Sequence, residues 1–448
     1  MIKLKINDIY KVKIVDYDKD GKGIAFINDK ICFIPNVLID EECNIRITKI
    51  TKNVLLGELV EILVKSKNRI ESDCIYSNRC GGCQLRHITY ETELEVKTNK
   101  VKNAFKHIAH MDNINYNEII KADKLYHYRN KAIIPFHKID NDIIYGMYEK
   151  NSHNIVNISN CLIENEILGE ILKITKKYLV SNNISIYDEN THKGIFRGIM
   201  LRNTCDNIFM LVFIVTKSID LYPLANLINN KYNMVKSIYL NINDNNNNVM
   251  LGYKNKLILG DELIYETILG KKYGVFVNTF LQVNHDQTEK LYSLAIEKLD
   301  ITKDDVVLDA FCGMGSITLS MSDKAKEVYG IEVVESAIDN AKENAKINSI
   351  SNAKFECGKC EDLIGKYVNK YKFSKMVFDP PRKGCDQSFL DAILKTDVEK
   401  IVYVSCNVAT LARDVKYLSS KYDVVDVTPV DLFPRTEHVE VICFLSLK

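Results

Sequence analysis

From Asn284 to the end of the chain, helix-like segments alternate with short apolar strands. A helix-like run leads to Leu299, and two strands close the chain. Between them lie the predicted strands Val306–Asp309, Glu327–Glu332, Lys354–Cys357, Lys375–Phe378 and Ile401–Val404. Alternating units of this kind form a parallel sheet that is covered by helices on both faces. The segment therefore predicts an α/β domain whose ligands bind where the strands end.

The remaining chain predicts two further domains, because 448 residues are too many for one ordinary domain. Residues 1–64 contain short alternating strands between tight turns, which predict a small β-barrel of the OB-like kind. Residues 65–270 combine a cysteine-rich stretch, a helix near 90–110 and several strands, and they predict a central mixed α+β domain. Residues 271–448 form the α/β domain, on which the helix near 90–110 could pack.

Composition excludes some classes of protein. The chain is 46% hydrophobic and 27% charged, which is typical of a globular protein. No apolar run approaches the about 20 residues of a membrane span, and the start, MIKLKINDIY, lacks a signal-peptide core. We therefore expect a cytoplasmic protein with no membrane partner. The net charge of +1 identifies no partner either.

One segment is locally basic. Residues Lys97 to Lys138 hold nine Lys/Arg against three Asp/Glu. Such a patch is typical of contact with a nucleic-acid backbone, and a merely solvated basic face is the alternative.

The turn after the strand Val306–Asp309 predicts a nucleoside site. Gly313 and Gly315 allow the backbone to turn tightly and to approach a ligand. The turn lacks the third glycine of the dinucleotide fingerprint and the GKS/T of a phosphate loop. Glu332 ends the next strand, where a carboxylate accepts hydrogen bonds from a ribose diol. A ribose without a pyrophosphate fits S-adenosylmethionine.

Two other strands end in residues that suit methyl transfer to a pyrimidine. Asp379 and the two prolines after it make a stiff exit at the carboxyl edge. Arg382 follows where adenine-methylating enzymes commonly carry an aromatic residue, which weakens an adenine reading. Cys406 ends the next strand, and a thiolate there could add to carbon 6 of uracil, so that carbon 5 attacks a methyl sulfonium. A base must then remove the proton of carbon 5, and the candidates are Glu437, His438 and Glu440.

Thirteen cysteines are many for a cytosolic chain, in which disulfides are rare. Metal ligation or thiol chemistry is the better explanation for some of them, above all in the stretch from Cys74 to Cys83. The spacing of these cysteines leaves zinc and an iron–sulfur cluster both open, although zinc ribbons usually carry paired C-x2-C knuckles.

Taken together, these residues resemble the RNA uracil-5-methyltransferase family, specifically its iron–sulfur 23S ribosomal RNA (uracil-5-)-methyltransferases, from end to end. The barrel is similar to a TRAM domain, a module found on RNA-modifying enzymes. The Asp-Pro-Pro-Arg, Ser-Cys-Asn and His-Val-Glu segments match the family's catalytic signatures. The likeness implies a Rossmann-like S-adenosylmethionine methyltransferase domain, with Cys406 as nucleophile and Glu440 as base. It implies cofactor contacts at Gln282, Phe311, Glu332 and Asp379, and a [4Fe–4S] cluster on Cys74, Cys80, Cys83 and Cys161.

The chain departs from the family pattern at two positions, and neither departure removes a reacting group. Val408 stands where the family often has proline, and Arg435 stands where it often has histidine, which concerns the fit of the substrate. The eight other cysteines are expected to be core or surface thiols: Cys32, Cys43, Cys205, Cys312, Cys357, Cys360, Cys385 and Cys443.

The sequence thus predicts a monomeric enzyme that makes 5-methyluridine in 23S rRNA, on a uridine turned out of its stack. A tRNA uracil-5-methyltransferase with the same chemistry is one alternative, and its relatives usually lack the barrel and the cluster. A non-catalytic RNA-binding protein is the other alternative. The joint presence of Cys406, Glu440 and the cofactor turn argues against it.

Overall fold

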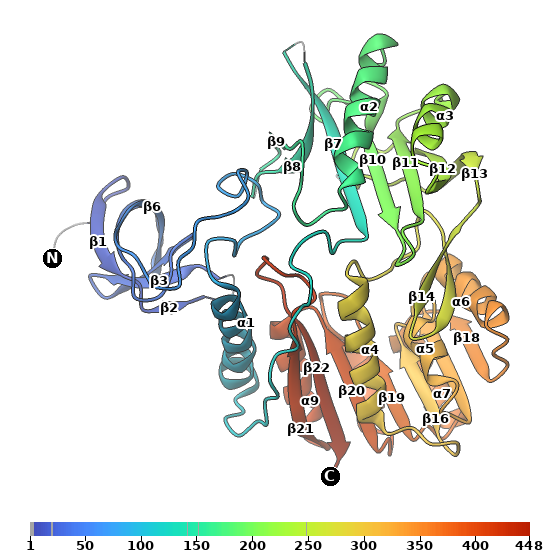
Figure 1. The fold of residues 1–448 in the computed structure, drawn as a ribbon. Helices are drawn as coiled ribbons and strands as arrows, with labels where there is room; N and C mark the ends of the chain where they lie inside the picture. Colours follow the sequence, from blue (N-terminus) through green and yellow to red (C-terminus); the bar gives the residue numbers. More distant parts are fainter. Residues whose placement is uncertain (1–3, 19–20, 141, 151, 248) are drawn as a thin grey trace.

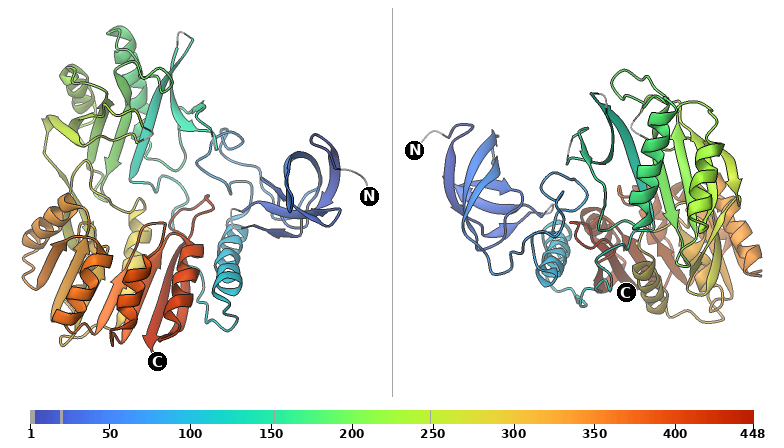
Figure 2. Two further views of the ribbon diagram at one scale, coloured as in Figure 1. Left: turned by 180° about the vertical axis from the view of Figure 1, so that it is seen from behind. Right: turned by 45° about the horizontal axis from the view of Figure 1, so that its top comes forward.

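The computed structural model describes residues 4–18, 21–140, 142–150, 152–247 and 249–448. Three large sheets and one hairpin organise this part of the chain, with helices packed on the second and third sheets (Figure 1). The first sheet projects to one side of the molecule, as the two turned views show (Figure 2). No helix in the described ranges is long and apolar enough to cross a membrane.

The first sheet is a strongly curved six-stranded module, so the predicted N-terminal β structure is confirmed. Its strand order is β1-β5-β6-β4-β3-β2, and β1 also contacts β3. Alternate residues point inward to a small core, which includes Ile14, Ile34 and Ile45 and buries Cys32 and Cys43. The strands are β1 (Ile9–Lys13), β2 (Asp16–Tyr17), β3 (Gly23–Ile27), β4 (Lys30–Ile34), β5 (Glu42–Ile50) and β6 (Val54–Val64).

The second sheet has the order β13-β12-β11-β10-β7-β8-β9. Every residue of β11 is buried, because this apolar strand lies in the middle of the sheet with both faces covered. The strands are β7 (Lys131–Ile139), β8 (Asp142–Tyr148), β9 (Ile155–Asn157), β10 (Phe196–Asn203), β11 (Phe209–Val215), β12 (Val235–Ile242) and β13 (Lys254–Gly260). Two helices, α2 (Ile167–Ser181) and α3 (Tyr222–Lys231), pack their apolar sides against it (Figure 1).

A short hairpin connects the second and third sheets. Its strands are β14 (Ile264–Ile268) and β15 (Lys271–Val275), and they pack against helices of the α/β domain. The domain boundary expected at 270/271 falls within the turn of this hairpin. Structurally, the α/β part of the chain therefore begins before β14.

The third sheet is the predicted α/β domain, with the order β18-β17-β16-β19-β20-β22-β21. Its strands are β16 (Val306–Ala310), β17 (Glu327–Glu332), β18 (Ala353–Cys357), β19 (Lys375–Phe378), β20 (Lys400–Ser405), β21 (Tyr422–Val430) and β22 (Glu440–Leu447). The expectation of a wholly parallel sheet is wrong at one strand, since β22 runs antiparallel to both β20 and β21. Only a loop joins β21 to β22, with no crossover helix that would make them parallel.

Helices cover both faces of this sheet, as predicted. On one face lie α4 (His285–Leu299), α5 (Ser316–Met321) and α6 (Glu335–Ile347). On the other face lie α7 (Cys360–Lys370), α8 (Gln387–Leu394) and α9 (Val408–Leu418). The helix α1 (Tyr90–Ala104) and a π-helical turn, η1 (Phe105–Ala109), join this second layer through contacts with α9.

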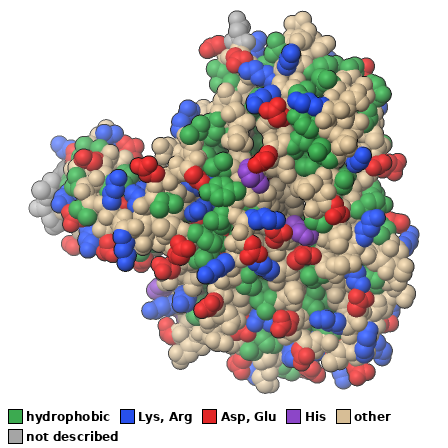
Figure 3. All heavy atoms as spheres, viewed as in Figure 1, with side chains coloured by type: hydrophobic (Ala, Val, Ile, Leu, Met, Phe, Trp, Pro, Cys, Tyr) green, Lys and Arg blue, Asp and Glu red, His purple; other side chains and the backbone are tan. Residues whose placement is uncertain are grey.

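A buried ion cluster fastens α1 to the loop between β21 and β22. The ammonium of Lys97 donates to Glu93 at 2.7 Å, to Asp431 at 2.6 Å and to the carbonyl of Phe433 at 3.1 Å. Lys97 is only 1% exposed, so it cannot contact RNA phosphates. This residue therefore belongs to the core and not to the basic patch that the sequence suggested. Elsewhere, acidic and basic side chains intermingle on the face in Figure 3.

We expect Lys97→Met to lower the free energy of unfolding by about 3–5 kcal/mol, because two buried carboxylates would lose their shared cation. Urea unfolding of the variant beside the wild type would measure the loss. Lys106→Met, at an exposed position on η1, is the control and should change stability little. Equal stability of the Lys97 and Lys106 variants would contradict the cluster's role.

Candidate active site

One large cavity opens along the carboxyl edge of the third sheet. Its volume is about 1320 Å³. The residues expected at the reaction and cofactor sites all line it, although they come from six different segments: Gln282, Phe311, Glu332, Asp379, Cys406 and Glu440. The cavity is thus the common meeting point of the predicted site residues.

The turn between β16 and α5 shapes the nucleoside end of the cavity. Phe311, Gly313 and Gly315 all have positive φ, and a Cβ on Gly315 would lie 3.0 Å from the Phe355 ring. Glycine is therefore required at position 315 both by conformation and by space. The carboxylate of Glu332 accepts from the backbone N–H of Gly313 at 3.2 Å and of Val334 at 3.0 Å, which fixes its orientation in the cavity wall.

Gln282 reaches the cavity from the segment before α4. The side chain of Asn130 donates to the Gln282 carbonyl at 2.9 Å, and the backbone N–H of Asn130 donates to the Val283 carbonyl at 2.8 Å. Asn284 then caps α4, with its side chain accepting from Gln287 N–H. These contacts fix the segment that carries Gln282 in the cavity wall.

Strand register brings Cys406 and Glu440 together. Ser405 pairs with Val441 across the antiparallel strands β20 and β22, so Cys406 follows one strand where Glu440 begins the other. Phe378 pairs with Tyr403 on the parallel side, which brings Asp379 to the same edge. The sequence predicted a closing strand here but not its antiparallel direction. That direction brings Glu440 close to the thiol of Cys406.

Asn407 ties the loop of Cys406 to the loop of Arg382. Its side-chain oxygen caps α9 by accepting from Ala409 N–H at 3.1 Å, and its side-chain nitrogen donates to the Arg382 carbonyl at 2.9 Å. Thr410 donates to the same carbonyl at 3.3 Å. The cap thus orients α9 and at the same time fixes the backbone of Arg382, whose charge acts to lower the pKa of the Cys406 thiol.

Burial favours the protonated forms of the reacting groups. Desolvation raises the pKa of Cys406 to about 11, with further contributions from Glu440 and Asp379. Desolvation and the charge of Asp379 raise the pKa of Glu440 well above its ordinary value, and one oxygen of this buried carboxyl has no hydrogen-bond partner. The charge of Arg382 acts against these shifts, because it tends to lower the pKa of both Cys406 and Glu440. Burial also raises the pKa of Asp379 to about 7.

The two other candidate bases differ from Glu440 in their surroundings. His438 lines the cavity, but burial and nearby cations lower its pKa to about 4. The carboxylate of Glu437 pairs with Lys150 at 3.3 Å.

Arg435, the residue that departs from the family pattern, is buried, and its guanidinium donates to the Ile88 carbonyl. It holds the loop to the segment before α1, a contact that no local signal in the sequence could reveal.

The cysteine-rich stretch folds against the strand β8. Gly81 N–H donates to the Tyr148 carbonyl at 2.9 Å, and a Cβ on Gly81 would lie 3.0 Å from backbone atoms there. Burial raises the pKa of Cys83, and nearby Cys80 and Cys74 add to this rise; burial also raises the pKa of Cys161, with a further contribution from Cys83. The backbone N–H of Gly82 donates to the sulfur of Cys80 at 3.4 Å. This donor set of four thiols suits a thiophilic metal centre.

Comparison with known proteins identifies the family. Residues 89–448 match the family described as tRNA (Uracil-5-)-methyltransferase, and residues 3–60 match the TRAM domain. An uncharacterized RNA methyltransferase of Staphylococcus aureus strain MSSA476 is 40% identical over 448 residues, 99% of each chain. One from Oceanobacillus iheyensis is 40% identical and covers 99% of this chain and 97% of its own.

A solved structure supports the same overall fold. The Pyrococcus abyssi tRNA (uracil-54, C5)-methyltransferase in complex with S-adenosyl-L-homocysteine aligns with 97% of this chain and 99% of its own, with a TM-score of 0.78 at 24% identity. Given a family match over most of its length and relatives that align from end to end, the chain belongs to the RNA (uracil-5-)-methyltransferases, and it is an S-adenosylmethionine-dependent enzyme that binds RNA and methylates carbon 5 of uracil.

Proposed function

We propose that Cys406 and Glu440 carry out the reaction, with Cys406 as nucleophile and Glu440 as base. The observation that carries this assignment is the strand register, which brings the two residues to the same edge of the sheet, where both line the large cavity. Three functional units follow: an RNA-binding barrel at 1–64, a central cluster domain at 65–270 and a catalytic domain at 271–448, whose structural start lies before β14.

The reaction begins when the Cys406 thiolate adds to carbon 6 of the target uracil and makes carbon 5 nucleophilic. The bound cofactor supplies the methyl group as a sulfonium, and carbon 5 takes it. Glu440 then removes the proton from carbon 5, and the electron pair left behind expels the Cys406 thiolate from carbon 6. Carbon 5 keeps the methyl group and the thiolate is regenerated, and Glu440 returns to its starting form when it releases the proton to solvent.

Four residues are proposed to hold the cofactor. Glu332 presents a fixed carboxylate to the ribose, and the backbone of the Phe311 turn approaches the nucleoside. Gln282 and Asp379 line the same cavity, and we place the amino-acid portion and the methyl group of the cofactor beside them. Both side chains are polar groups that converge on a largely apolar cavity.

Arg382 should control the acidity of the reacting groups. Since burial raises the pKa of Cys406 to about 11, the thiolate fraction, and with it the single-turnover rate, should rise about tenfold per pH unit through neutrality. Arg382→Gln should slow the reaction by about tenfold at neutral pH and less at high pH, because the lost cation raises the pKa further. A pH–rate profile tests this. An equal loss at every pH would contradict the electrostatic role.

We also propose a [4Fe–4S] cluster on Cys74, Cys80, Cys83 and Cys161. Four cysteine thiolates are the usual ligands of such a cluster, which would crosslink the loop to the central sheet. No three of these sulfurs lie within 4.8 Å of one another, although they are close enough to interact.

Anaerobically purified protein should be brown and contain about four irons per chain. Cys83→Ser should lose the colour and much of the soluble yield, because the loop would lose its organising centre. Its RNA affinity should fall more than its cofactor affinity. Cys357→Ser, at an exposed thiol on β18, is the control and should keep both iron and yield. One zinc per chain without iron or sulfide would contradict the cluster.

The proposed target is a uridine of 23S rRNA. The cysteine pattern, which resembles that of the iron–sulfur rRNA enzymes, supports this choice. A tRNA target is the second candidate, because the tRNA enzyme of Pyrococcus abyssi aligns with 97% of this chain. So long an alignment includes most of the N-terminal barrel, which therefore does not distinguish the two targets.

Mapping 5-methyluridine in rRNA and tRNA from cells with and without the gene would decide between them. We expect a 23S rRNA uridine to lose its methyl group in the deletion strain and to regain it with the wild-type gene, but not with a Cys406→Ala gene. Loss from tRNA alone would favour the second candidate. Unchanged methylation in both RNAs would contradict the assignment.

A further inference from the structure

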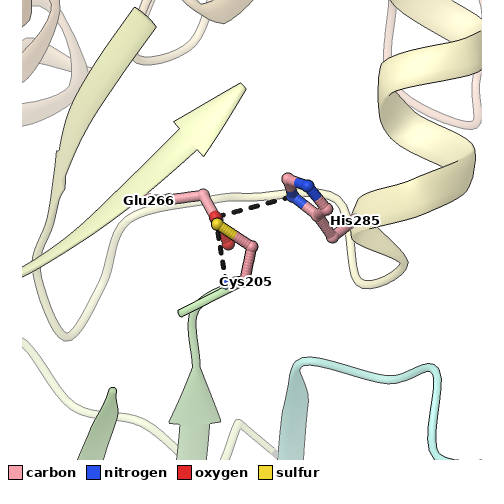
Figure 4. Close-up of side chains that lie close together, drawn as sticks. All are labelled: Cys205, Glu266 and His285. Carbon is pink, nitrogen blue, oxygen red and sulfur yellow. Dashed lines mark hydrogen bonds and ion pairs between the residues drawn. The ribbon is translucent and has the colours of Figure 1, made fainter. Parts of the chain in front are cut away.

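A second group of possible metal ligands lies outside the cavity. Cys205 lies in the turn between β10 and β11, Glu266 lies on β14, and His285 is the first residue of α4. One sulfur, one carboxylate oxygen and one imidazole nitrogen from these residues lie within 4.8 Å of one another. Figure 4 shows the three side chains converging from three separate elements.

The carboxylate of Glu266 is only half satisfied. Glu266 is 1% exposed, and its Oε1 accepts from the backbone N–H of Cys205 at 3.1 Å and of Thr267 at 3.0 Å. Its Oε2 is buried and has no hydrogen-bond partner. Buried carboxylate oxygens are nearly always paired, so the free Oε2 points to a missing partner that carries positive charge.

The neighbouring cations do not provide that partner. The guanidinium of Arg202 attracts Glu266, but it donates to the carbonyls of Phe276 and Thr279. Nδ1 of His285 lies 3.5 Å from Oε1, and Nε2 lies 3.8 Å from the carboxylate of Glu289. Such a carboxylate behind the imidazole is the usual support of a metal-binding histidine, because it fixes which nitrogen faces the ion.

We propose that Cys205, Glu266 and His285 bind a divalent zinc-class cation. Thiolate, imidazole and carboxylate are the three ligand types that zinc takes in proteins. Inward movements of about 1 Å would bring the three atoms to zinc-ligand spacing. Cys205 is exposed, so the ion can enter from solvent and a water can complete the tetrahedron. On binding, the thiol gives its proton to solvent and the sulfur forms the metal bond.

The site would couple the central sheet to the cofactor cavity. An ion there joins the β10–β11 turn to the start of α4, and only two residues separate His285 from Gln282. The ion would therefore position the segment that carries Gln282. This consequence rests on the proposed cofactor role of Gln282, whereas the metal site itself does not.

The test measures how zinc changes the alkylation of each cysteine in the cluster-loaded protein. Peptide mass spectrometry after iodoacetamide treatment gives the rate for Cys205, and Cys357, a second exposed cysteine, is the internal reference. We expect zinc chloride to slow alkylation of Cys205 by about tenfold or more, because a metal-bound thiolate is masked. Cys357 should react at the same rate with and without zinc.

Two variants test the other ligands. Glu266→Gln keeps an oxygen that can accept from the two backbone N–H groups but removes the charge, and His285→Ala removes the imidazole. In both variants, zinc should no longer protect Cys205. His285 is only partly buried, so this variant remains informative if the Glu266 variant does not fold. Equal alkylation of Cys205 with and without zinc, or protection that survives in the folded variants, would overturn the proposal.

Discussion

Cys406→Ala should lower turnover by about 10⁴-fold or more while cofactor affinity stays within a few-fold of the wild type. Without the thiolate, nothing adds to carbon 6, and carbon 5 of uracil remains a poor nucleophile. The cofactor turn and Glu332 lie on other strands, so their geometry does not depend on the sulfur. Tritium transfer from labelled cofactor to RNA, together with calorimetric cofactor binding, would measure the two effects separately.

RNA containing 5-fluorouridine provides a second test of the same residue. Fluorine cannot leave carbon 5 as a proton would, so the wild type should form an adduct that survives denaturation, and Cys406→Ala should form none. The control is Cys357→Ala, because Cys357 also ends a strand of this sheet but is exposed and does not line the cavity. That variant should keep both activity and adduct. Full methylation by Cys406→Ala would rule out the nucleophile assignment.

The α/β domain was readable from the sequence because its signals are local. Each parallel strand is a short apolar run, and each ends near a glycine, proline or polar residue that marks the carboxyl edge. The structure keeps these strands, for example Glu327–Glu332 and Lys375–Phe378 with the predicted bounds. Residues that follow parallel strands must meet at one edge, so the cavity could be anticipated without knowing the helix packing.

Contacts between distant segments could not be read in the same way. Lys97 has the sequence context of a surface lysine on a basic helix, yet it pairs with Asp431, 334 residues away. Arg435 likewise gave no local sign of its contact with the segment before α1. The antiparallel course of β22 depends on the absence of a crossover helix, and a list of apolar runs contains little information about strand direction.

The trio of Cys205, Glu266 and His285 illustrates the same limit. Glu266 and His285 lie 61 and 80 residues after Cys205 in the sequence, so the three residues show no motif spacing. Only the packing of the hairpin between two sheets brings them together. Glu440, in contrast, was anticipated from a resemblance, and the strand register supplies the physical reason why it lies near the thiol.

Because Glu440 lies near the thiol, its substitution should produce the second large effect on turnover. We expect Glu440→Gln to slow turnover by about 10²–10⁴-fold and to accumulate a covalent protein–RNA adduct on ordinary uridine. The amide keeps the shape of the side chain but cannot take the proton from carbon 5. The methyl group is then transferred, and the thiolate of Cys406 stays bonded to carbon 6. Denaturing gels with labelled RNA would reveal the adduct, and mass spectrometry would show whether it carries the methyl group.

Glu437→Gln is the matched control, because Glu437 lies three residues before Glu440, in the loop that leads to β22, and pairs with Lys150 at 3.3 Å. It should turn over at nearly the wild-type rate and show no adduct. A methylated adduct in the Glu440 variant alone assigns proton removal to this residue, since addition and methyl transfer must already have occurred. If Glu440→Gln turned over normally while Glu437→Gln or His438→Ala stalled, the base would be the residue whose loss causes the stall, and the buried carboxyl of Glu440 would have only an electrostatic role beside Cys406.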